Sequence, residues 1–240
     1  MIYQIISLHR TGTHLLGEYT NSYDEIFTAG WGIKDNKLYY DKNLDQWPFV
    51  QKKSSINLTK AKFDWLEKQK KNNIHYPIIV NNLLYRKNSY RNFIKRLIKY
   101  YEGYHILTVK RDSWDRFKSY WFQVCTRFQH CHVFKEDTTW KMPVDFKMNM
   151  DKESIKEFIS DEHAHYRLLK QVLENVTMHT TIEYDDLNKT YLNNFFKNKD
   201  KLVKYLPMNI EYEQYIVDVE YWKKYYERLN NSYVTKLATS

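Results

Sequence analysis

Residues 5–16 read Ile5-Ile6-Ser7-Leu8-His9-Arg10-Thr11-Gly12-Thr13-His14-Leu15-Leu16, and the rest of the chain is expected to be organised around them. An apolar run typical of a buried β-strand leads into a short polar turn, and a segment able to begin a helix follows at once. In such a unit the backbone N–H groups of the turn and of the helix N-terminus point the same way and can bind an anion. The stretch therefore favours a loop for phosphate or sulfate, with an ordinary turn capped by Thr13 as the alternative.

The side chains of the turn also suit an anion. Arg10 carries a permanent positive charge, Thr11 and Thr13 carry hydroxyl donors, and Gly12 lets the backbone approach a ligand closely. All four residues are therefore candidate binding residues.

The chain has the length and composition of one folded unit. It contains 240 residues, of which 42% are hydrophobic, with 5 glycines and 4 prolines. These values predict a single domain over residues 1–240, with a real core and no low-complexity linker. The net charge of +9 indicates an anionic partner. It does not choose among nucleic acid, an acidic polymer and a polyphosphorylated cofactor.

Cysteine usage and hydropathy set the expected location. Cys125 and Cys131 are too few for a disulfide framework or, by themselves, for a four-ligand metal site. The chain begins without a signal-peptide pattern, and no apolar run approaches the ~20 residues needed to span a bilayer. We expect a soluble, cytoplasmic protein that binds no metal and no membrane.

Strands and helices are expected to alternate along the chain. The patterns predict strands over residues 3–8, 76–80, 105–109 and 179–184, and helices over 90–101, 113–128, 154–175 and 212–229, with a polar loop over 34–58 and a frayed end over 231–240. This alternation indicates an α/β domain with a mostly parallel sheet flanked by helices and a helical C-terminal part.

Three polar segments follow the carboxyl ends of predicted strands, where parallel sheets bind ligands. Arg10, Arg111 and Tyr184 each stand at such an end. Ser119 comes eight residues after Arg111, on the next helix, so that a guanidinium and a hydroxyl can bind one phosphate from two sides. We therefore expect the three segments to form one site.

Three motifs resemble those of the sulfotransferase family. His9-Arg10-Thr11-Gly12-Thr13-His14-Leu15-Leu16 is similar to the family's 5′-phosphosulfate loop. The segment from Val109-Lys110-Arg111-Asp112 to Ser119-Tyr120-Trp121 resembles its 3′-phosphate motif, and Ile182-Glu183-Tyr184-Asp185-Asp186-Leu187 resembles the Tyr-Glu-Asp-Leu segment that commonly follows. The motifs occur in the family's order and span residues 5–187.

The resemblance implies a P-loop-like domain that moves a sulfuryl group, without a metal, from 3′-phosphoadenosine-5′-phosphosulfate (PAPS) to a hydroxyl or amine of a small-molecule or carbohydrate acceptor. It assigns Arg10 to the charge that grows on the bridging oxygen. It assigns the 5′-phosphate to Thr11, Gly12, Thr13 and His14, the 3′-phosphate to Arg111 and Ser119, and the border of the adenosine to Tyr184.

The same resemblance suggests a base for the acceptor's proton. Asp24-Glu25-Ile26-Phe27 is similar to a segment that carries a catalytic glutamate in some branches, so Glu25 is the expected base, with Asp24, Glu18 and His14 as alternatives. The histidine that other branches use has no counterpart here, and neither has the family's C-terminal Arg-Lys-Gly element. Arg127 or a lysine within 197–204 is a candidate replacement, and Trp31, Trp47, Tyr39 and Tyr40 are candidate acceptor contacts.

Two other functions agree with parts of the sequence. A P-loop kinase needs a glycine and a lysine at the positions that Ser7 and Thr13 occupy here. A basic nucleic-acid-binding module suits the net charge and the aromatic content, but the sequence lacks a base-contacting motif. We therefore expect an enzyme with no nucleic-acid partner.

Overall fold

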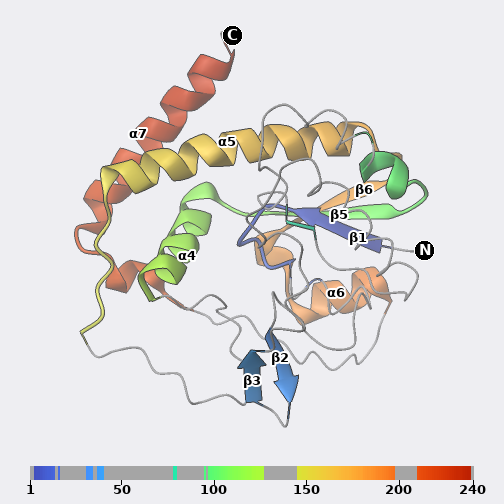
Figure 1. Cartoon of the computed structure of the whole chain (residues 1–240), viewed down its shortest axis with the longest axis horizontal. Coiled ribbons are helices and arrows are strands. Elements are labelled where there is room, and N and C mark those ends of the chain that lie inside the picture. Colours follow the sequence, from blue (N-terminus) through green and yellow to red (C-terminus); the bar gives the residue numbers. More distant parts are fainter. Residues whose placement is uncertain are drawn as a thin grey trace.

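The computed structural model describes residues 3–13, 16, 31–34, 37–40, 78–79, 95, 97–126, 145–197 and 210–238 (Figure 1). The strands are β1 (Tyr3–Ser7), β2 (Trp31–Lys34), β3 (Lys37–Tyr40), β4 (Ile78–Ile79), β5 (His105–Lys110) and β6 (His179–Glu183). The helices are α4 (Ser113–Thr126), α5 (Lys152–Glu174), α6 (Lys189–Phe196) and α7 (Val219–Ala238), with 3₁₀ helices η2 (Tyr184–Asp186) and η3 (Tyr212–Tyr215).

A parallel sheet forms the centre of the described structure. β1, β5 and β6 make a three-stranded parallel sheet, which the two-residue β4 extends beside β1, so that the strand order is β4-β1-β5-β6. Four of the five residues of β1 are buried, and Tyr3 is half-buried, as is usual for a parallel strand that lies between two others. The predicted α/β class with a parallel sheet and a helical C-terminal part is confirmed.

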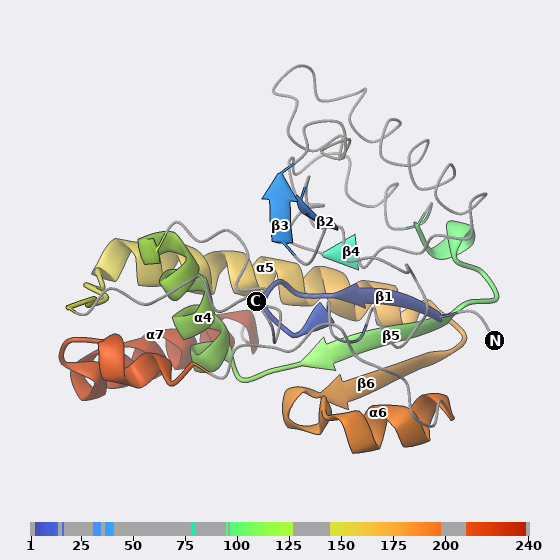
Figure 2. The same ribbon diagram turned by 90° about the horizontal axis from the view of Figure 1, so that it is seen from below.

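Successive residues of the strands enter different cores because side chains alternate across a sheet. Ile6 and Ile106 pack with Leu168 and Val172 of α5. Ile5 and Leu107, their neighbours in sequence, pack with Leu192 of α6 on the other face. Figure 2 shows the sheet lying between α5 and α6.

A third core lies beyond the carboxyl ends of the strands, where α4, α5 and α7 meet (Figure 2). Phe117 of α4, Ile159 of α5 and Tyr226 of α7 are all buried there. Asp112 caps α4, since its carboxylate accepts the Asp115 N–H at 3.0 Å. This packing fixes α4 at the end of β5 and so fixes the side chains that follow Arg111.

Three details differ from the expectations. Lys37–Tyr40 is a strand, paired antiparallel with Trp31–Lys34, within the segment expected to be a polar loop; its leucine and tyrosines favour a strand. Tyr184, expected as the last residue of the strand from residue 179, instead begins a 3₁₀ helix that continues to Asp186, and α6 follows from Lys189 with Asn188 as its cap. The last helix begins at Val219 and continues to Ala238, through most of the end expected to be frayed.

Among the described helices, none has an apolar stretch of the length that a lipid bilayer requires.

Candidate anion-binding site

The loop after β1 turns sharply through two residues with left-handed backbone. Arg10 has φ 64° and Gly12 has φ 78°. A left-handed arginine costs of order 1 kcal/mol, and strain of this kind clusters at functional sites. The loop leads directly into a helical turn, since the Leu16 N–H donates to the Gly12 carbonyl at 3.3 Å.

Gly12 leaves no room for a side chain. A β-carbon built on it would lie 2.6 Å from Leu187 Cδ1 and 3.2 Å from Tyr184 Cε2. The loop after β6 therefore packs directly on the loop after β1. Because of this close contact, the first and third motifs are adjacent in space as well as at matching strand ends.

The Thr11 hydroxyl is directed into the protein. It donates to the Leu8 carbonyl at 2.8 Å and lies 2.9 Å from Ser7 Oγ, and the residue is 1% exposed. Ser7 Oγ in turn donates to the Val109 carbonyl of β5 at 3.1 Å. The hydroxyl thus stabilises the turn, and in this arrangement only the backbone N–H of Thr11 is left to meet a ligand.

Arg10 and Ser119 are in direct contact although 109 residues separate them. Arg10 Nε and Nη2 donate to Ser119 Oγ at 2.9 and 2.7 Å, and Ser119 is 1% exposed. The hydroxyl of Tyr212 lies 3.3 Å from the same oxygen. The first and second motifs therefore converge on one point, at which a guanidinium, a serine hydroxyl and a phenol are close together.

Arg111 lies against the same loop. Its Nη1 donates to the Arg10 carbonyl at 3.1 Å, and its guanidinium carbon lies 3.9 Å from the centre of the Tyr184 ring. Its Nε is buried and has no hydrogen-bond partner among the described residues. A buried donor without a partner is costly, and an anion would satisfy it.

Six of the expected site residues form this cluster: Arg10, Thr11, Gly12, Arg111, Ser119 and Tyr184. Thr13 follows them, 3% exposed, in the first turn of the helix. His14 and Glu25 lie outside the described residues, as do Glu18, Asp24, Trp47 and Arg127. Trp31, Tyr39 and Tyr40 belong to the β2–β3 hairpin. The assigned roles stay predictions.

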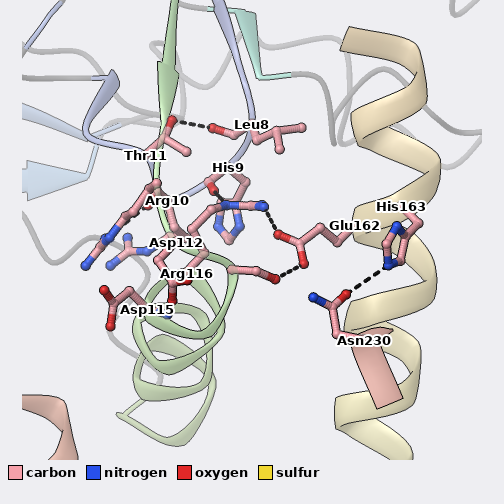
Figure 3. A network of polar contacts seen from close by, with 12 residues as sticks. Leu8, His9, Arg10, Thr11, Asp112, Asp115, Arg116, Glu162, His163 and Asn230 are labelled. Atoms are coloured by element: carbon pink, nitrogen blue, oxygen red, sulfur yellow. Dashed lines mark hydrogen bonds and ion pairs between the residues drawn. The ribbon is translucent and has the colours of Figure 1, made fainter. Parts of the chain in front are cut away.

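Sequence reasoning missed a second arginine beside the loop. Arg116 of α4 donates from Nε to the His9 carbonyl at 3.0 Å and forms an ion pair with Glu162 of α5 (Figure 3). Both residues are almost wholly buried. Glu162 lies on the same face of α5 as the buried Ile155, Ile159 and Leu169. A carboxylate within such an apolar face is the sequence signal that could have indicated a buried ion pair.

Two cavities adjoin this arginine. One, of about 240 Å³, lies beside Arg111 and Thr11 and is walled by Leu8, Val109 and Leu169. The other, of about 130 Å³, is polar and is lined by His9, Glu162 and exposed carboxylates of α5. The anion cluster is therefore bordered by space for larger parts of a ligand.

The histidines beside Arg116 are held neutral. Desolvation, with Arg10 and Arg116 as weaker causes, keeps the pKa of His9 well below its usual value. Burial lowers the pKa of His165 to about 4, and the nearby Asp161 carboxylate opposes this shift only in part. Because the pKa of each histidine is lower in the folded protein than in the unfolded chain, the unfolded chain takes up a proton first. Stability therefore decreases as the pH falls below the pKa of the histidine in the unfolded chain.

Replacing His165 by asparagine is expected to weaken the pH dependence of stability. Between pH 6.5 and 4 the unfolded chain protonates this residue while the folded chain does not. The wild type should therefore lose about 2 kcal/mol at pH 5 relative to pH 7 through this residue alone. Urea unfolding at both pH values measures the loss, and a pair of curves at pH 7 and 8 is the control. An identical pH 7-to-5 loss in the variant contradicts the prediction.

Comparisons with known proteins place the chain in no family. No model of a known protein family matches it, and no curated protein has a similar sequence.

Proposed function

We propose that the protein is a sulfotransferase with a P-loop-like fold that uses PAPS as its donor. The observation that carries the proposal is the meeting of two cationic strand ends. Arg111, after β5, hydrogen-bonds to the backbone of Arg10, after the neighbouring β1, while Arg10 hydrogen-bonds to Ser119. Arginine side chains that approach from different strands suit a ligand with more than one phosphate.

The residues of the cluster fit the anionic groups of this nucleotide. The buried Nε of Arg111 needs an acceptor, and the Arg10 guanidinium, which now bonds to Ser119, supplies a second positive charge. Arg10 now uses Ser119 as its acceptor, so nucleotide binding would exchange this hydrogen bond for bonds to phosphate. Arg111 and Ser119 would then hold the 3′-phosphate, while Arg10 and the N–H groups of residues 11–13 would hold the 5′-phosphate.

The bound donor supplies an electrophilic sulfuryl group, which the acceptor's oxygen or nitrogen attacks as the bond from sulfur to the phosphate oxygen breaks. Arg10 would stabilise the negative charge that accumulates on that phosphate oxygen. The side chains of the cluster already provide two full positive charges for this purpose. A carboxylate base takes the acceptor's proton, and Glu25 is the proposed base.

Calorimetry with 3′-phosphoadenosine-5′-phosphate (PAP), the donor's product, tests the proposal. We expect PAP to bind, and ATP with Mg²⁺ to bind much more weakly because it has no 3′-phosphate for Arg111 and Ser119. Binding of ATP with Mg²⁺ but not PAP would favour the kinase. Binding of oligonucleotides alone, with a steep salt dependence, would favour the nucleic-acid-binding module.

Replacing Glu25 by glutamine is expected to lower turnover by about 100-fold or more while PAP affinity changes little, because an amide cannot accept the acceptor's proton. Transfer of radiolabelled sulfate from PAPS to a panel of phenols and sugars measures turnover. Asp24→Asn is the matched control, since it removes the neighbouring carboxylate. Turnover near that of the wild type in the Glu25 variant would remove the assignment, and loss in the Asp24 variant alone would transfer the role to Asp24.

A further inference from the structure

A buried polar network lies directly behind the anion-binding loop (Figure 3). Its centre is Arg116, which is 1% exposed. One edge of its guanidinium donates from Nε to the His9 carbonyl at 3.0 Å, and Nη1 pairs with Glu162 Oε1. A single planar group thus connects α5 to the peptide that precedes Arg10.

The orientation of Glu162 is fixed from two further elements. Its second carboxylate oxygen accepts a hydrogen bond from Ser113 Oγ, at the start of α4, and one from the Tyr226 hydroxyl of α7 at 3.2 Å. Burial raises the pKa of Tyr226 far above its usual value, so the phenol keeps its proton and remains a donor. Arg116 is therefore held in place by α4, α5 and α7 together.

The hydrogen bond to His9 has a consequence for the next residue. The described peptides are all trans, so the C=O of His9 and the N–H of Arg10 point in opposite directions. Because Arg116 holds the carbonyl towards the helices, the Arg10 N–H faces away from them. Arg111 acts in the same way one peptide later, where it holds the Arg10 carbonyl and so orients the Thr11 N–H.

We propose that Arg116 is a positioning residue, which turns the His9–Arg10 peptide so that its N–H, and not its carbonyl oxygen, faces the 5′-phosphate. This inference rests on the proposed function. A carbonyl oxygen facing the phosphate would repel it, whereas an N–H donates a charge-assisted hydrogen bond. Nε and Nη1 of Arg116 bond to the His9 carbonyl and to Glu162, so these two atoms act on the phosphate through the loop that binds it. The buried Nη2 has no hydrogen-bond partner among the described residues.

The test compares two nucleotides that differ only in the 5′-phosphate, PAP and adenosine 3′-phosphate. Their affinity ratio, measured by calorimetry, reports the contribution of the 5′-phosphate alone. In Arg116→Lys the charge beside Glu162 is kept, but one ammonium cannot reproduce both bonds of the guanidinium fork. We expect the ratio to fall by about tenfold, the equivalent of one charge-assisted hydrogen bond. General destabilisation would weaken both nucleotides equally and leave the ratio unchanged.

Lys118→Met is the matched control. Lys118 is also a buried cation of α4 with carboxylate partners, Asp115 and Glu213, but it makes no bond to the loop. In the Lys118→Met variant, the ratio of the affinities for PAP and adenosine 3′-phosphate should equal that of the wild type. If Arg116→Lys fails to fold, Tyr226→Phe removes only the hydroxyl that orients Glu162, and its ratio should fall by about two- to threefold.

The outcomes separate the two proposals. A wild-type protein that binds PAP and an Arg116→Lys or Tyr226→Phe variant with an unchanged ratio overturn the positioning role and leave the sulfotransferase proposal intact. A wild-type protein that binds neither nucleotide overturns both. A fall of the ratio that Lys118→Met shares equally also overturns the positioning role, because it would show that any buried cation of α4 has this effect.

Discussion

Replacing Arg111 by alanine is expected to lower the affinity for PAP by at least about 30-fold, because removal of one partner of a charge-assisted pair costs about 2 kcal/mol or more. Arg111 contributes twice. Its guanidinium holds the Arg10 carbonyl at 3.1 Å, and its buried Nε has no other partner among the described residues, so it is placed to donate to a ligand. The alanine variant would lose the contact with the 3′-phosphate and also loosen the loop. Calorimetry with PAP measures the loss.

Lys110→Ala is the control for this experiment. Lys110 is the neighbouring cation in sequence, but its side chain is 57% exposed and pairs with Glu183 at 3.2 Å on the surface of the sheet. Its removal should change PAP affinity by less than about threefold, because exposed ion pairs are weak and screened by salt. Equal losses of PAP affinity in the two variants would mean that PAP responds only to the net positive charge of the protein and makes no specific contact with Arg111. An Arg111 variant with wild-type affinity would remove the assignment of the 3′-phosphate.

Replacing Glu162 by alanine is expected to lower the free energy of unfolding by about 3–5 kcal/mol, which is a large part of the stability of an ordinary domain. The substitution leaves the Arg116 charge buried without its counter-ion, and it also removes the acceptor of the Ser113 and Tyr226 hydroxyls. Urea unfolding measures the effect. We expect this to be the largest loss of stability from any carboxylate described here.

Two further variants give this prediction its controls. Glu183→Ala breaks the exposed pair with Lys110 and should cost less than about 1 kcal/mol. The double variant Arg116→Met with Glu162→Ala should cost clearly less than the sum of its single variants, because both singles remove the same interaction. A Glu162 variant within about 1 kcal/mol of the wild type, or strictly additive effects, would contradict a tightly coupled buried pair.

Much of the fold was predictable because local patterns and burial agree. The apolar runs that begin at Tyr3 and His105 are strands, and the run from His179 is the third strand of the parallel sheet. The bounds of α5 were predicted to within about two residues, since Asp151 supplies a cap and apolar residues recur at helical spacing. Errors occurred where a short segment had to choose between turn, 3₁₀ helix and strand, as in residues 37–40 and 184–186.

The location of the candidate site was also predictable, because all parallel strands end at the same edge of their sheet. This rule alone places Arg10, Arg111 and Tyr184 near one another, and the structure has them in contact through the Arg10 carbonyl and the Tyr184 ring. The direction of each side chain was not predictable. A threonine in such a loop often donates its hydroxyl to a phosphate, yet the hydroxyl of Thr11 donates to the Leu8 carbonyl inside the turn.

The class of the fold, the order of its strands along the chain and the edge of the sheet at which the cationic residues lie can be read from the amino-acid sequence, since they follow from periodicity and from the geometry of parallel strands. The contact of Arg10 with Ser119, and those of Arg116 with Glu162 and the His9 carbonyl, become visible only in the three-dimensional packing. The physical reason is that a buried charge is stable only beside its partner, and that partner stands on another element, where no local pattern records the pairing.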